Sequence, residues 1–407
     1  RKKKNRRTAA RIKIATLNMK GRGSIPPDLT NDKWSTINQI MRDKKLALVA
    51  VQETHLTTQH VEDLHTLFGK RLKILHSEPT DRASSSQGIA FVLNKERLNT
   101  SDARLRTIIP GRAALLSLTW HKQVHLKILN VYAPNDRAEN ELFWKSLAET
   151  WRNESIPNPD IMTGDFNVVE ERKDRLPERA DHAGSIHALQ DLCIQLRLVD
   201  TWREQYPDKR EYTYVQDHGT SMSRLDRIYI NHRLGKNANE WLTEPADSMS
   251  TDHLLHSVMV ADDKIPYVGS GRWNVPKAVI SDHEFINYVT EQGKKFIHDV
   301  QRLRQRTTSR NPQTLYQSFK TDILERARAL AKINIPKLVK RIDKLKLERT
   351  KTLNTPEPRD EHLIATQAAA LLERIRELEA RRFNTTRKAV ATKDWTHGEK
   401  ITKYWVQ

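Results

Sequence analysis

The feature that most constrains the fold is a long series of short apolar segments between residues 11 and 260, with few helical segments among them. Ten segments have the length and the apolar, β-branched composition of strands: 11–18, 46–54, 72–77, 88–94, 114–120, 124–134, 160–167, 211–216, 223–231 and 254–260. Helical spacing of apolar residues occurs at 31–44, 137–152 and 184–198. A parallel sheet would need a helix between most strands. The pattern therefore predicts an α/β sandwich, two packed sheets flanked by helices.

The sequence changes character after residue 261. Residues 262–280 include the Gly- and Pro-containing segment GSGRWNVP and are predicted to be a linker. Residues 281–407 consist mainly of long helical segments, and the last of them, EHLIATQAAALLERIRELEARRF, carries an apolar stripe without a sustained heptad repeat. This favours packing onto another domain over a free coiled coil. We expect a basic tail at 1–11, a folded domain at 12–261, the linker and a basic helical extension.

The formal net charge of +19 is concentrated on both sides of the predicted domain. Residues 1–11 contain seven Lys and Arg and no acidic residue, residues 12–261 contain 33 of each sign, and residues 262–407 contain 30 basic and 18 acidic residues. This distribution favours a neutral domain with extensions that bind polyanions. A solvated tail or a nuclear-import signal is the more ordinary interpretation of RKKKNRR, and a solvated helix face is an equal alternative for the basic extension.

Composition excludes several classes of protein. No apolar run approaches the roughly 18–20 residues that span a bilayer, and the N-terminal residues lack the apolar core of a signal peptide. The single cysteine, Cys193, excludes an internal disulfide framework and a Cys-based zinc site. Its helical neighbours favour a small core residue over a reactive thiol. We expect a nuclear protein of a reducing compartment with no membrane partner.

The segment DIMTGDFN at 160–167 ends in two polar residues that flank an apolar one. In an extended chain, alternation places Asp165 and Asn167 on one side and Phe166 on the other, in the core. A turn at a strand end is the ordinary explanation of such residues. Polar residues, however, also lie at the ends of the other strands: Asn18, Glu53, Tyr132, Asn135, Asp226, Thr251, Asp252 and His253. In α/β folds functional sites assemble at such positions.

These residue types suit the hydrolysis of a phosphodiester. The carboxylates of Glu53 and Asp252, helped by Asn18, offer the oxygen ligands that Mg²⁺ prefers. Such an ion offsets the negative charge that develops on the phosphoryl oxygens. The neutral side chains that can donate to those oxygens without adding charge are Asn167, Tyr132 and Thr213.

Proton transfer requires an acid or base beside the phosphate. Asp165 can accept a proton from an attacking water molecule. A pairing of His253 with Asp226 would fix the tautomer of the histidine and stabilise its charged form. The sequence alone does not bring these groups together.

Six short motifs occur in an order that resembles the endonuclease/exonuclease/phosphatase superfamily, which has the DNase I-like fold: TLNMKG (16–21), VQET (51–54), NVYAPN (130–135), GDFN (164–167), SRLDRIYI (223–230) and STDH (250–253). Each motif alone is weak, whereas six in order across about 240 residues are strong. The phrases EYTYVQDHGTSMSRLDRIYI and DFNVVEERKDRLPE look most like the apurinic-type endonuclease of non-LTR (LINE-type) retrotransposons. GRWNVP and the terminal residues 395–405 resemble the segment that leads toward a reverse transcriptase.

The resemblance implies a role for each matching residue. Glu53 matches the principal metal ligand, with Asn18 and Asp252 beside it, and Asp226 matches the carboxylate that orients His253. Asp165 matches the residue that activates the water or protonates the leaving group. Contacts with phosphate or DNA are implied for Asn167, Tyr132, Thr213, Thr251, Asn135 and Arg224. The one departure is Thr251, where serine is more usual, and it keeps the hydroxyl.

The function implied is a Mg²⁺-dependent DNA endonuclease, with Mn²⁺ as an alternative metal, that nicks double-stranded target DNA and leaves a 3′-hydroxyl for target-primed reverse transcription. The expected partners are the DNA target, the element's RNA through the basic extension, and a reverse transcriptase in the same polypeptide. Two alternatives on the same fold are an abasic-site repair endonuclease and a phosphoinositide- or sphingolipid-type phosphatase.

Overall fold

The structure is a computed structural model that describes residues 11–24, 32–80, 87–121, 124–216, 221–246, 249–262, 275, 277–280, 282–333, 337–355 and 360–398. Residues 1–10, most of the expected linker and the last nine residues, with the motifs predicted there, lie outside this part of the chain. The chain divides into two compact units, one formed by residues 1–268 with 345–407 and the other by residues 269–344. The residues of the expected helical extension thus belong partly to each unit.

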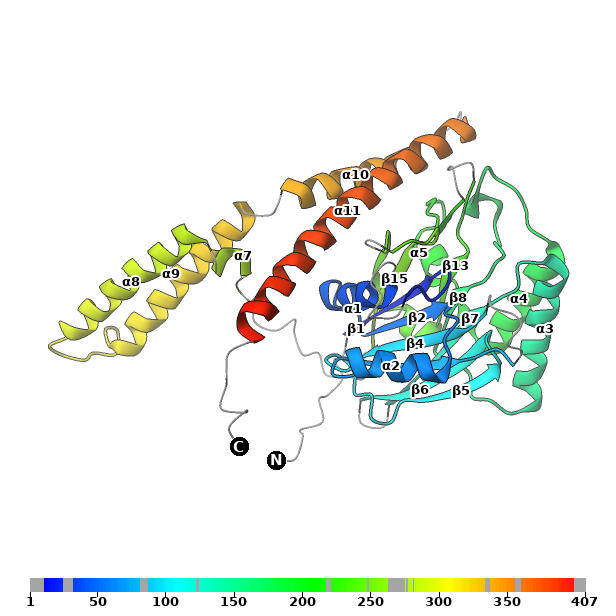
Figure 1. Ribbon diagram of the computed structural model, residues 1–407, viewed down its shortest axis with the longest axis horizontal. Helices are drawn as coiled ribbons and strands as arrows, with labels where there is room; N and C mark the ends of the chain where they lie inside the picture. The colour runs from blue at the N-terminus through cyan, green and yellow to red at the C-terminus, as the bar shows by residue number, and fades with distance from the viewer. Residues whose placement is uncertain are drawn as a thin grey trace. The chain divides into compact units, whose positions relative to one another are not determined.

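The first unit contains two six-stranded sheets that face each other (Figure 1). In spatial order, one sheet consists of β14 (Asn239–Glu244), β15 (Leu255–Ala261), β1 (Arg11–Asn18), β2 (Leu48–Gln52), β4 (Ile89–Asn94) and β3 (Leu72–Ser77). The other consists of β10 (Leu198–Val199), β13 (Asp226–Asn231), β8 (Ile161–Asp165), β7 (Val124–Tyr132), β6 (Ala113–His121) and β5 (Arg104–Ile109). The predicted α/β sandwich and its DNase I-like architecture are confirmed.

Alternating side chains explain why the sheets are buried on both faces. On β1, Ile12 and Ile14 pack between the sheets, whereas Ala15 and Leu17 face the helices α1 (Lys33–Asp43) and α2 (Thr58–Phe68). Helices α3 (Arg137–Asn153) and α4 (Ala183–Leu196) cover the second sheet. Such alternation places successive residues of a strand in two separate cores. Cys193 lies in the α3–α4 layer, as predicted for a core residue.

The directions of the strands bring the predicted site together. β1 and β2 are parallel, as are β7 and β8, so that all four end at the same edge of the sandwich. β13 and β15 run antiparallel to β8 and β1, so they begin where those strands end. Asp226, the first residue of β13, is the register partner of Asp165, the last residue of β8. Ends of parallel strands and beginnings of antiparallel strands therefore converge.

A small third sheet lies beside this edge and was not predicted. It consists of β11 (Tyr214–Val215), β12 (Met222–Ser223) and β9 (Arg175–Leu176), which pair antiparallel in this order. The remaining short elements of the first unit are the 3₁₀ turn Arg172–Asp174, α5 (Thr201–Gln205) and α6 (His232–Gly235).

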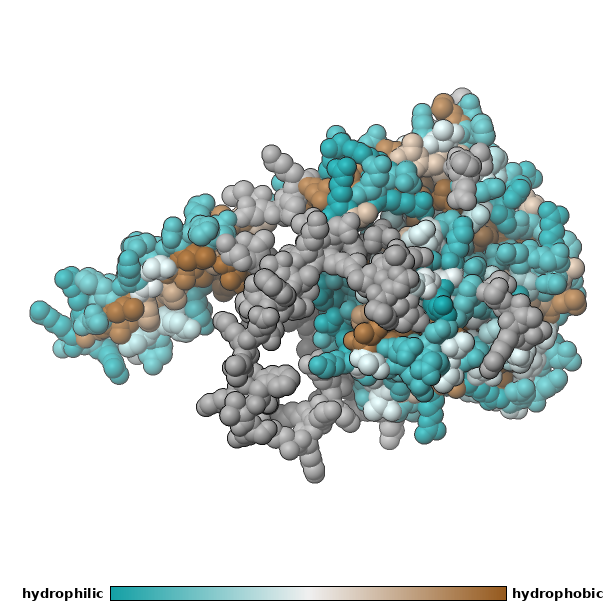
Figure 2. Space-filling view, in the orientation of Figure 1, coloured by the Kyte–Doolittle hydropathy of each residue, from teal (hydrophilic) through white to brown (hydrophobic). Residues whose placement is uncertain are grey.

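The second unit is helical. Helices α7 (Lys277–Ile280), α8 (His283–Gln301) and α9 (Pro312–Ile333) share a small core that includes Phe285 and Leu330. Apolar side chains also reach the surface of the α8–α9 pair, among them Ile297 and Tyr316, and Figure 2 shows hydrophobic patches on these helices. Helix α10 (Lys337–Leu353) begins in this unit, and α11 (Glu361–Gly398) belongs to the first. None of the helices in the described residues is long and apolar enough to span a bilayer.

Candidate active site

Asn18 connects two acidic side chains at the edge where the strands converge. Its fully buried amide nitrogen donates to Glu53 Oε1 at 2.8 Å and to Asp165 Oδ2 at 2.9 Å. The hydroxyl of Tyr132 donates to the same oxygen of Glu53 at 3.0 Å. The side-chain oxygen of Asn18 accepts the backbone N–H of Lys20 at 2.9 Å. Asn18 was expected to help bind a metal. In the structure its nitrogen holds the two carboxylates together, and its oxygen already accepts a backbone N–H.

The backbone at the ends of β2 and β8 adopts conformations that few residues tolerate. Glu53 has φ of +51° and Asn167 has φ of +50°. Asparagine visits this left-handed region with little strain, whereas for glutamate the conformation is costly. The N–H of Gly21 donates to the carbonyl oxygen of Glu53 at 3.1 Å and helps to hold it there. This left-handed backbone conformation sets the direction in which the Glu53 side chain leaves the end of the strand.

The turn after β8 explains how Asp165 and Asn167 reach the same cavity. β8 ends at Asp165, and the backbone N–H of Asn167 donates to Asp165 Oδ1 at 3.1 Å. The amide of Asn167 donates to the Ala133 carbonyl oxygen at 2.8 Å. The prediction that strand alternation pairs these residues was wrong, because a tight left-handed turn does so. Phe166 lies fully buried and stacks on Trp144 with ring centroids 5.4 Å apart, which confirms its predicted place in the core.

His253 and Asp226 form a buried pair, as the sequence predicted. Nδ1 of His253 lies 2.8 Å from Asp226 Oδ2, so the carboxylate fixes the ring and its tautomer. Nε2 lies 3.9 Å from Asp165 Oδ2 and 4.0 Å from Asp252 Oδ1. The free edge of the imidazole therefore faces two carboxylates. Tyr214 lies against the ring, with the ring centroids 5.0 Å apart.

Burial and charge set the protonation of this group. Burial and the nearby Asp226 carboxylate raise the pKa of Asp165 to about 7, against the opposing effect of His253. Burial disfavours charge on His253, but the charge and hydrogen bond of Asp226 raise the pKa of the imidazole to about 9. Burial and the Glu53 carboxylate raise the pKa of Tyr132, which stays a neutral donor. At neutral pH His253 thus carries a proton, and Asp165 can give or take one.

A cavity opens above these residues. Its lining includes the side chains of Lys20, Glu53, Asn135, Asp165, Asn167, Arg175, Tyr214, Leu225, Asp252 and His253. Lys20 Nζ lies 2.9 Å from Asp252 Oδ2. The buried ammonium of Lys33, on α1, donates to the carbonyl oxygens of Met19 and Lys20 at 2.6 and 2.9 Å. Lys33 thereby holds the loop that carries Lys20 over the cavity.

Two groups of acidic residues suit a metal ion. Glu53 and Asp252 both line the cavity and offer the hard oxygen donors that Mg²⁺ and Mn²⁺ take. Ligand atoms of Asp165, Asp226 and His253 lie within 4.8 Å of one another. Hydrogen bonds and ion pairs already engage atoms of both groups: Nδ1 of His253 with Asp226 in the second, and Glu53 Oε1 and Asp252 Oδ2 in the first. The first group consists of carboxylates alone, the ligands that a hard cation prefers.

Three residues predicted to contact phosphate have structural partners instead. Thr213 is fully buried, and its hydroxyl accepts the backbone N–H of Asp226 at 2.9 Å. The hydroxyl of Thr251 donates to the carbonyl oxygen of Asn18 at 2.9 Å. Arg224 is buried and does not line the cavity, because Asp174 and Asp200 bind its guanidinium at 2.8 and 2.7 Å. The expected contact of Arg224 with DNA does not fit this placement.

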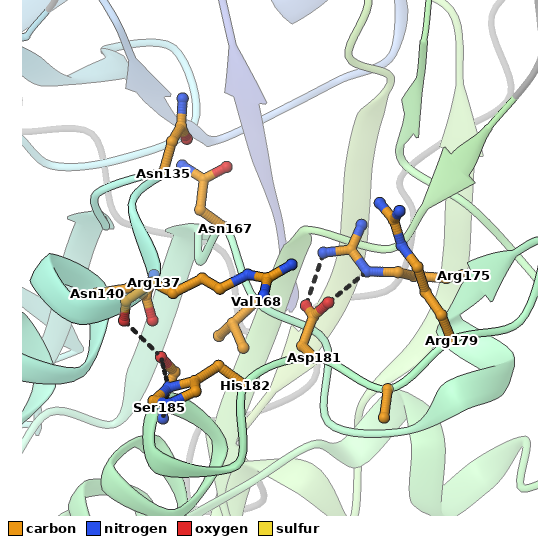
Figure 3. A pocket seen from close by; sticks show the side chains of 11 residues that line it. Asn135, Arg137, Asn140, Asn167, Val168, Arg175, Arg179, Asp181, His182 and Ser185 are labelled. Carbon is orange, nitrogen blue, oxygen red and sulfur yellow. Dashed lines mark hydrogen bonds and ion pairs between the residues drawn. The ribbon is translucent and has the colours of Figure 1, made fainter.

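A second cavity adjoins the first and shares Asn135, Asn167 and Arg175 with it. It lies where α3 and α4 begin, and Figure 3 shows Arg137 extending toward the pair formed by Arg175 and Asp181. Asp181 accepts two hydrogen bonds from Arg175, at 2.7 and 2.6 Å. Arg137 and Arg179 are exposed, and helix N-termini attract anions. This second cavity therefore suits an anion.

Residues of the two cavities that were not predicted from the sequence include Lys20, Tyr214, Arg137, Arg175 and Arg179. Lys20 and Tyr214 lie inside segments that were singled out, TLNMKG and EYTYVQ, so their positions could have been suspected. Arg175 likewise lies inside DFNVVEERKDRLPE. Arg137 and Arg179 have no local signal, because loops and helix ends from separate parts of the chain bring them together.

Three comparisons describe what the chain resembles. Residues 15–283 match the profile of the Endonuclease/Exonuclease/phosphatase family. Over 190 residues, 46% of the chain, it is 36% identical to the transposon TX1 uncharacterized 149 kDa protein of Xenopus laevis, of which it spans 14%. AP endonuclease LMAP from Leishmania major superposes with a TM-score of 0.51 at 18% identity, over 62% of this chain and 88% of its own. The endonuclease domain of TRAS1, a telomere-specific non-LTR retrotransposon, superposes with a TM-score of 0.44 at 13% identity, over 62% of this chain and 100% of its own.

Proposed function

The chain belongs to the endonuclease/exonuclease/phosphatase family, a family of hydrolases of phosphate esters, and from this premise we propose that it is a metal-dependent DNA endonuclease. The proposed reaction nicks one strand of duplex DNA by hydrolysis of a phosphodiester and leaves a 3′-hydroxyl. The identity with a transposon protein supports a retrotransposon as the source. In such an element the new 3′-hydroxyl would prime reverse transcription.

The observation that carries the proposal is the junction of the two cavities. The catalytic groups line one cavity, and exposed arginines line the other, while Asn135, Asn167 and Arg175 belong to both. A single phosphate group would occupy only the first cavity. A nucleic-acid strand continues through further phosphates, and the second cavity offers them a basic site.

Glu53 and Asp252 would hold the metal ion. When bound, the ion would supply positive charge to the phosphoryl oxygens as negative charge develops on them. The proposal expects Mg²⁺, with Mn²⁺ as a substitute. A direct readout is Mn²⁺ binding followed by electron paramagnetic resonance, which Glu53→Gln should weaken by at least ~10-fold, whereas the exposed Glu149→Gln should leave binding unchanged.

The chain's own residues account for binding and proton transfer. Asn167 and the protonated Nε2 of His253 face the cavity and would donate to oxygens of the scissile phosphate. Asp165 would take a proton from the attacking water or return one to the leaving oxygen, because its raised pKa of about 7 allows both at neutral pH. Asp226 would keep the imidazole oriented and charged through its 2.8 Å contact.

A plasmid assay tests the proposal. Supercoiled plasmid incubated with the full chain and Mg²⁺ should become relaxed circles, and chelation of the metal should stop the reaction. A DNA polymerase should extend the nicked strand directly, because extension requires a 3′-hydroxyl. Persistence of supercoiled plasmid under these conditions would refute the proposal.

The second cavity gives the nucleic-acid part of the proposal its own test. Arg137→Ala combined with Arg179→Ala should raise KM and reduce the slope of log affinity against log salt by about two, roughly one for each lost phosphate contact. The matched control is Arg152→Ala, an exposed arginine near the other end of α3. An unchanged slope in the double variant would remove the second cavity from the DNA path.

Two alternatives give different results on defined substrates. A repair enzyme would strongly prefer an abasic duplex over an undamaged one. A lipid phosphatase would release phosphate from a lipid headgroup and leave plasmid intact. The basic second cavity favours a nucleic-acid strand over a small headgroup, and the abasic comparison decides between the two nucleases.

The element's RNA, a reverse transcriptase in the same polypeptide and a nuclear location belong to the same proposal. Their support is the basic composition of residues 262–407 and the transposon relative. Basic residues that would meet RNA phosphates include Arg302, directly after α8, and Lys340 and Arg341 of α10. RNA affinity of the full chain should fall steeply with rising salt if they do.

A further inference from the structure

The position of the catalytic histidine depends on the small third sheet. His253 forms an isolated antiparallel bridge with Tyr214 of β11. On either side of it, the N–H of Val215 donates to the Asp252 carbonyl at 3.1 Å, and the N–H of Leu254 donates to the Thr213 carbonyl at 2.6 Å. A movement of the small sheet would therefore move His253.

Helix α11 packs on this sheet with its apolar side. Ala365, Ala368 and Leu372 are almost completely buried and form one hydrophobic cluster with residues of β9, β11 and β12. Leu254, the residue after His253, is fully buried in the same cluster. The small alanine side chains let the helix approach closely. The helix is thus in contact with the segment that carries the histidine.

A polar contact joins the same helix to the other side of that segment. Arg376, two turns beyond Ala368 on the same face of α11, donates from Nη2 to the carbonyl oxygen of Thr251 at 3.3 Å. Thr251 precedes His253 by two residues, and its hydroxyl accepts the backbone N–H of His253 at 3.2 Å. Arg376 therefore holds the backbone that positions the catalytic group.

Further polar contacts secure the part of α10 that belongs to the first unit. Lys346 lies 2.9 Å from both Glu244 of β14 and Glu379 of α11. Asn354 and the backbone of Arg210 exchange two hydrogen bonds, at 2.9 and 3.2 Å. These contacts join α10 to α11, to β14 and to the loop before β11.

We propose that residues 345–355 and 360–382 form a brace that positions His253 for catalysis, with Arg376 as a positioning residue. The inference rests on the proposed nuclease function and extends it. A helix that only covered apolar surface would add to the stability of the fold. The brace does more, because it contacts the residues on both sides of His253, and it comes from a part of the chain beyond the family match at 15–283.

Paired substitutions in the full chain test the brace. Ala368→Glu places a charge in the buried cluster, whereas Ala370→Glu makes the same change on the exposed side of the same helix. Ala368→Glu should lower kcat by ~10²-fold, the scale expected for a catalytic group displaced by about 1 Å, with little change in KM. Ala370→Glu should match the wild type.

The second pair keeps the test valid if Ala368→Glu fails to fold. Arg376→Ala should lower kcat by about 10-fold, since a weaker restraint shifts the histidine by less, and Arg376→Lys should restore part of the loss. Arg374→Ala removes a partly exposed arginine of the same helix that pairs with Glu377 and should change nothing. Equal kcat for Arg376→Ala and Arg374→Ala would overturn the proposal.

Hydrogen exchange separates the brace from the nuclease function. In Arg376→Ala, deuterium uptake should increase in a peptide covering 249–256 and stay unchanged in one covering β7. If the wild type cleaves no DNA, the proposed function fails while exchange still tests the brace. If the wild type cleaves DNA and uptake at 249–256 is the same in both proteins, the brace fails alone.

Discussion

The bridge made by Asn18 gives the sharpest test of the site's geometry. Its single amide nitrogen serves both Glu53 and Asp165, at 2.8 and 2.9 Å, in a fully buried position. Asn18→Asp keeps the shape of the side chain but replaces the donor with a third acceptor. Asn18→Ala removes the bridge and leaves room for water. The two variants therefore separate the loss of shape from the loss of the donor.

The size of the effect follows from the two hydrogen bonds. A hydrogen bond to a charged group contributes about 1.5–3 kcal/mol, so Asn18→Asp loses roughly 3–6 kcal/mol of stabilisation at the site. Protonation of one of the three carboxylates would relieve part of the repulsion. We therefore expect the free energy of unfolding to fall by about 3 kcal/mol. We also expect kcat to fall by at least ~10²-fold, because both carboxylates lose their orientation.

The assay compares wild type, Asn18→Asp and Asn18→Ala in plasmid nicking and in urea unfolding at pH 7. The bridge predicts that Asn18→Asp is the more damaging of the two in both measurements, although it preserves the volume. If Asn18 only fills space, the order reverses, because the aspartate fits and the alanine leaves a void. An Asn18→Asp variant with wild-type activity would refute the reasoning.

Three further predictions concern the frame of the site. Gly164→Ala, where a β-carbon would overlap the carbonyl oxygen of Val131, should lower the free energy of unfolding by about 3 kcal/mol in urea titration. Arg224→Gln takes away the guanidinium that binds Asp174 and Asp200, although Arg203 still pairs with Asp174, and should cost about 3 kcal/mol without changing the salt dependence of DNA binding. Burial opposes the charge on Glu244, but two lysines lower its pKa to about 2, so Glu244→Gln should destabilise the protein by up to about 3 kcal/mol at pH 7. Because the folded pKa lies below the ordinary value of 4.5, that difference should be complete above about pH 4.5 and disappear as the pH falls toward 2.

For each of these three variants, one result would contradict the prediction. A fully stable Gly164→Ala protein would mean that β7 and β8 are not as close as described. A smaller salt slope for Arg224→Gln would return this arginine to the DNA-binding surface. A pH-independent difference between wild type and Glu244→Gln would show that the charge of Glu244 is not what stabilises its surroundings.

The central strands and the catalytic residues were predictable because their signals are local. The strands from the middle of each sheet are apolar on both faces, and polar residues such as Glu53 and Asp165 stand out where they end. Two edge strands, β5 and β14, gave no such signal, whereas the edge strand β3 was predicted at 72–77. In β5 and β14 most side chains are at least partly exposed and several are charged, so no apolar period marks them.

The remaining features of the site could not be predicted, because they depend on contacts between distant parts of the chain. The left-handed turn that carries Asn167 does not follow from strand alternation, which predicted the right neighbours for the wrong reason. Arg224 lies in a motif beside Asp226, yet the carboxylates of Asp174 and Asp200, from other elements, bind it. The packing of α11 on the small sheet likewise joins residues more than a hundred positions apart, which composition and periodicity do not register.

The most direct test of the account is single-turnover cleavage of an undamaged, end-labelled DNA duplex in Mg²⁺ by wild type, Asp165→Ala and the control Asp191→Ala. Asp191 is an exposed aspartate on α4. We predict a single-strand nick with a 3′-hydroxyl for the wild type and for Asp191→Ala, and a rate at least ~10²-fold lower for Asp165→Ala, the low end for the loss of an acid–base group. An undamaged duplex left intact by the wild type, or cleavage by Asp165→Ala at the wild-type rate, would contradict it.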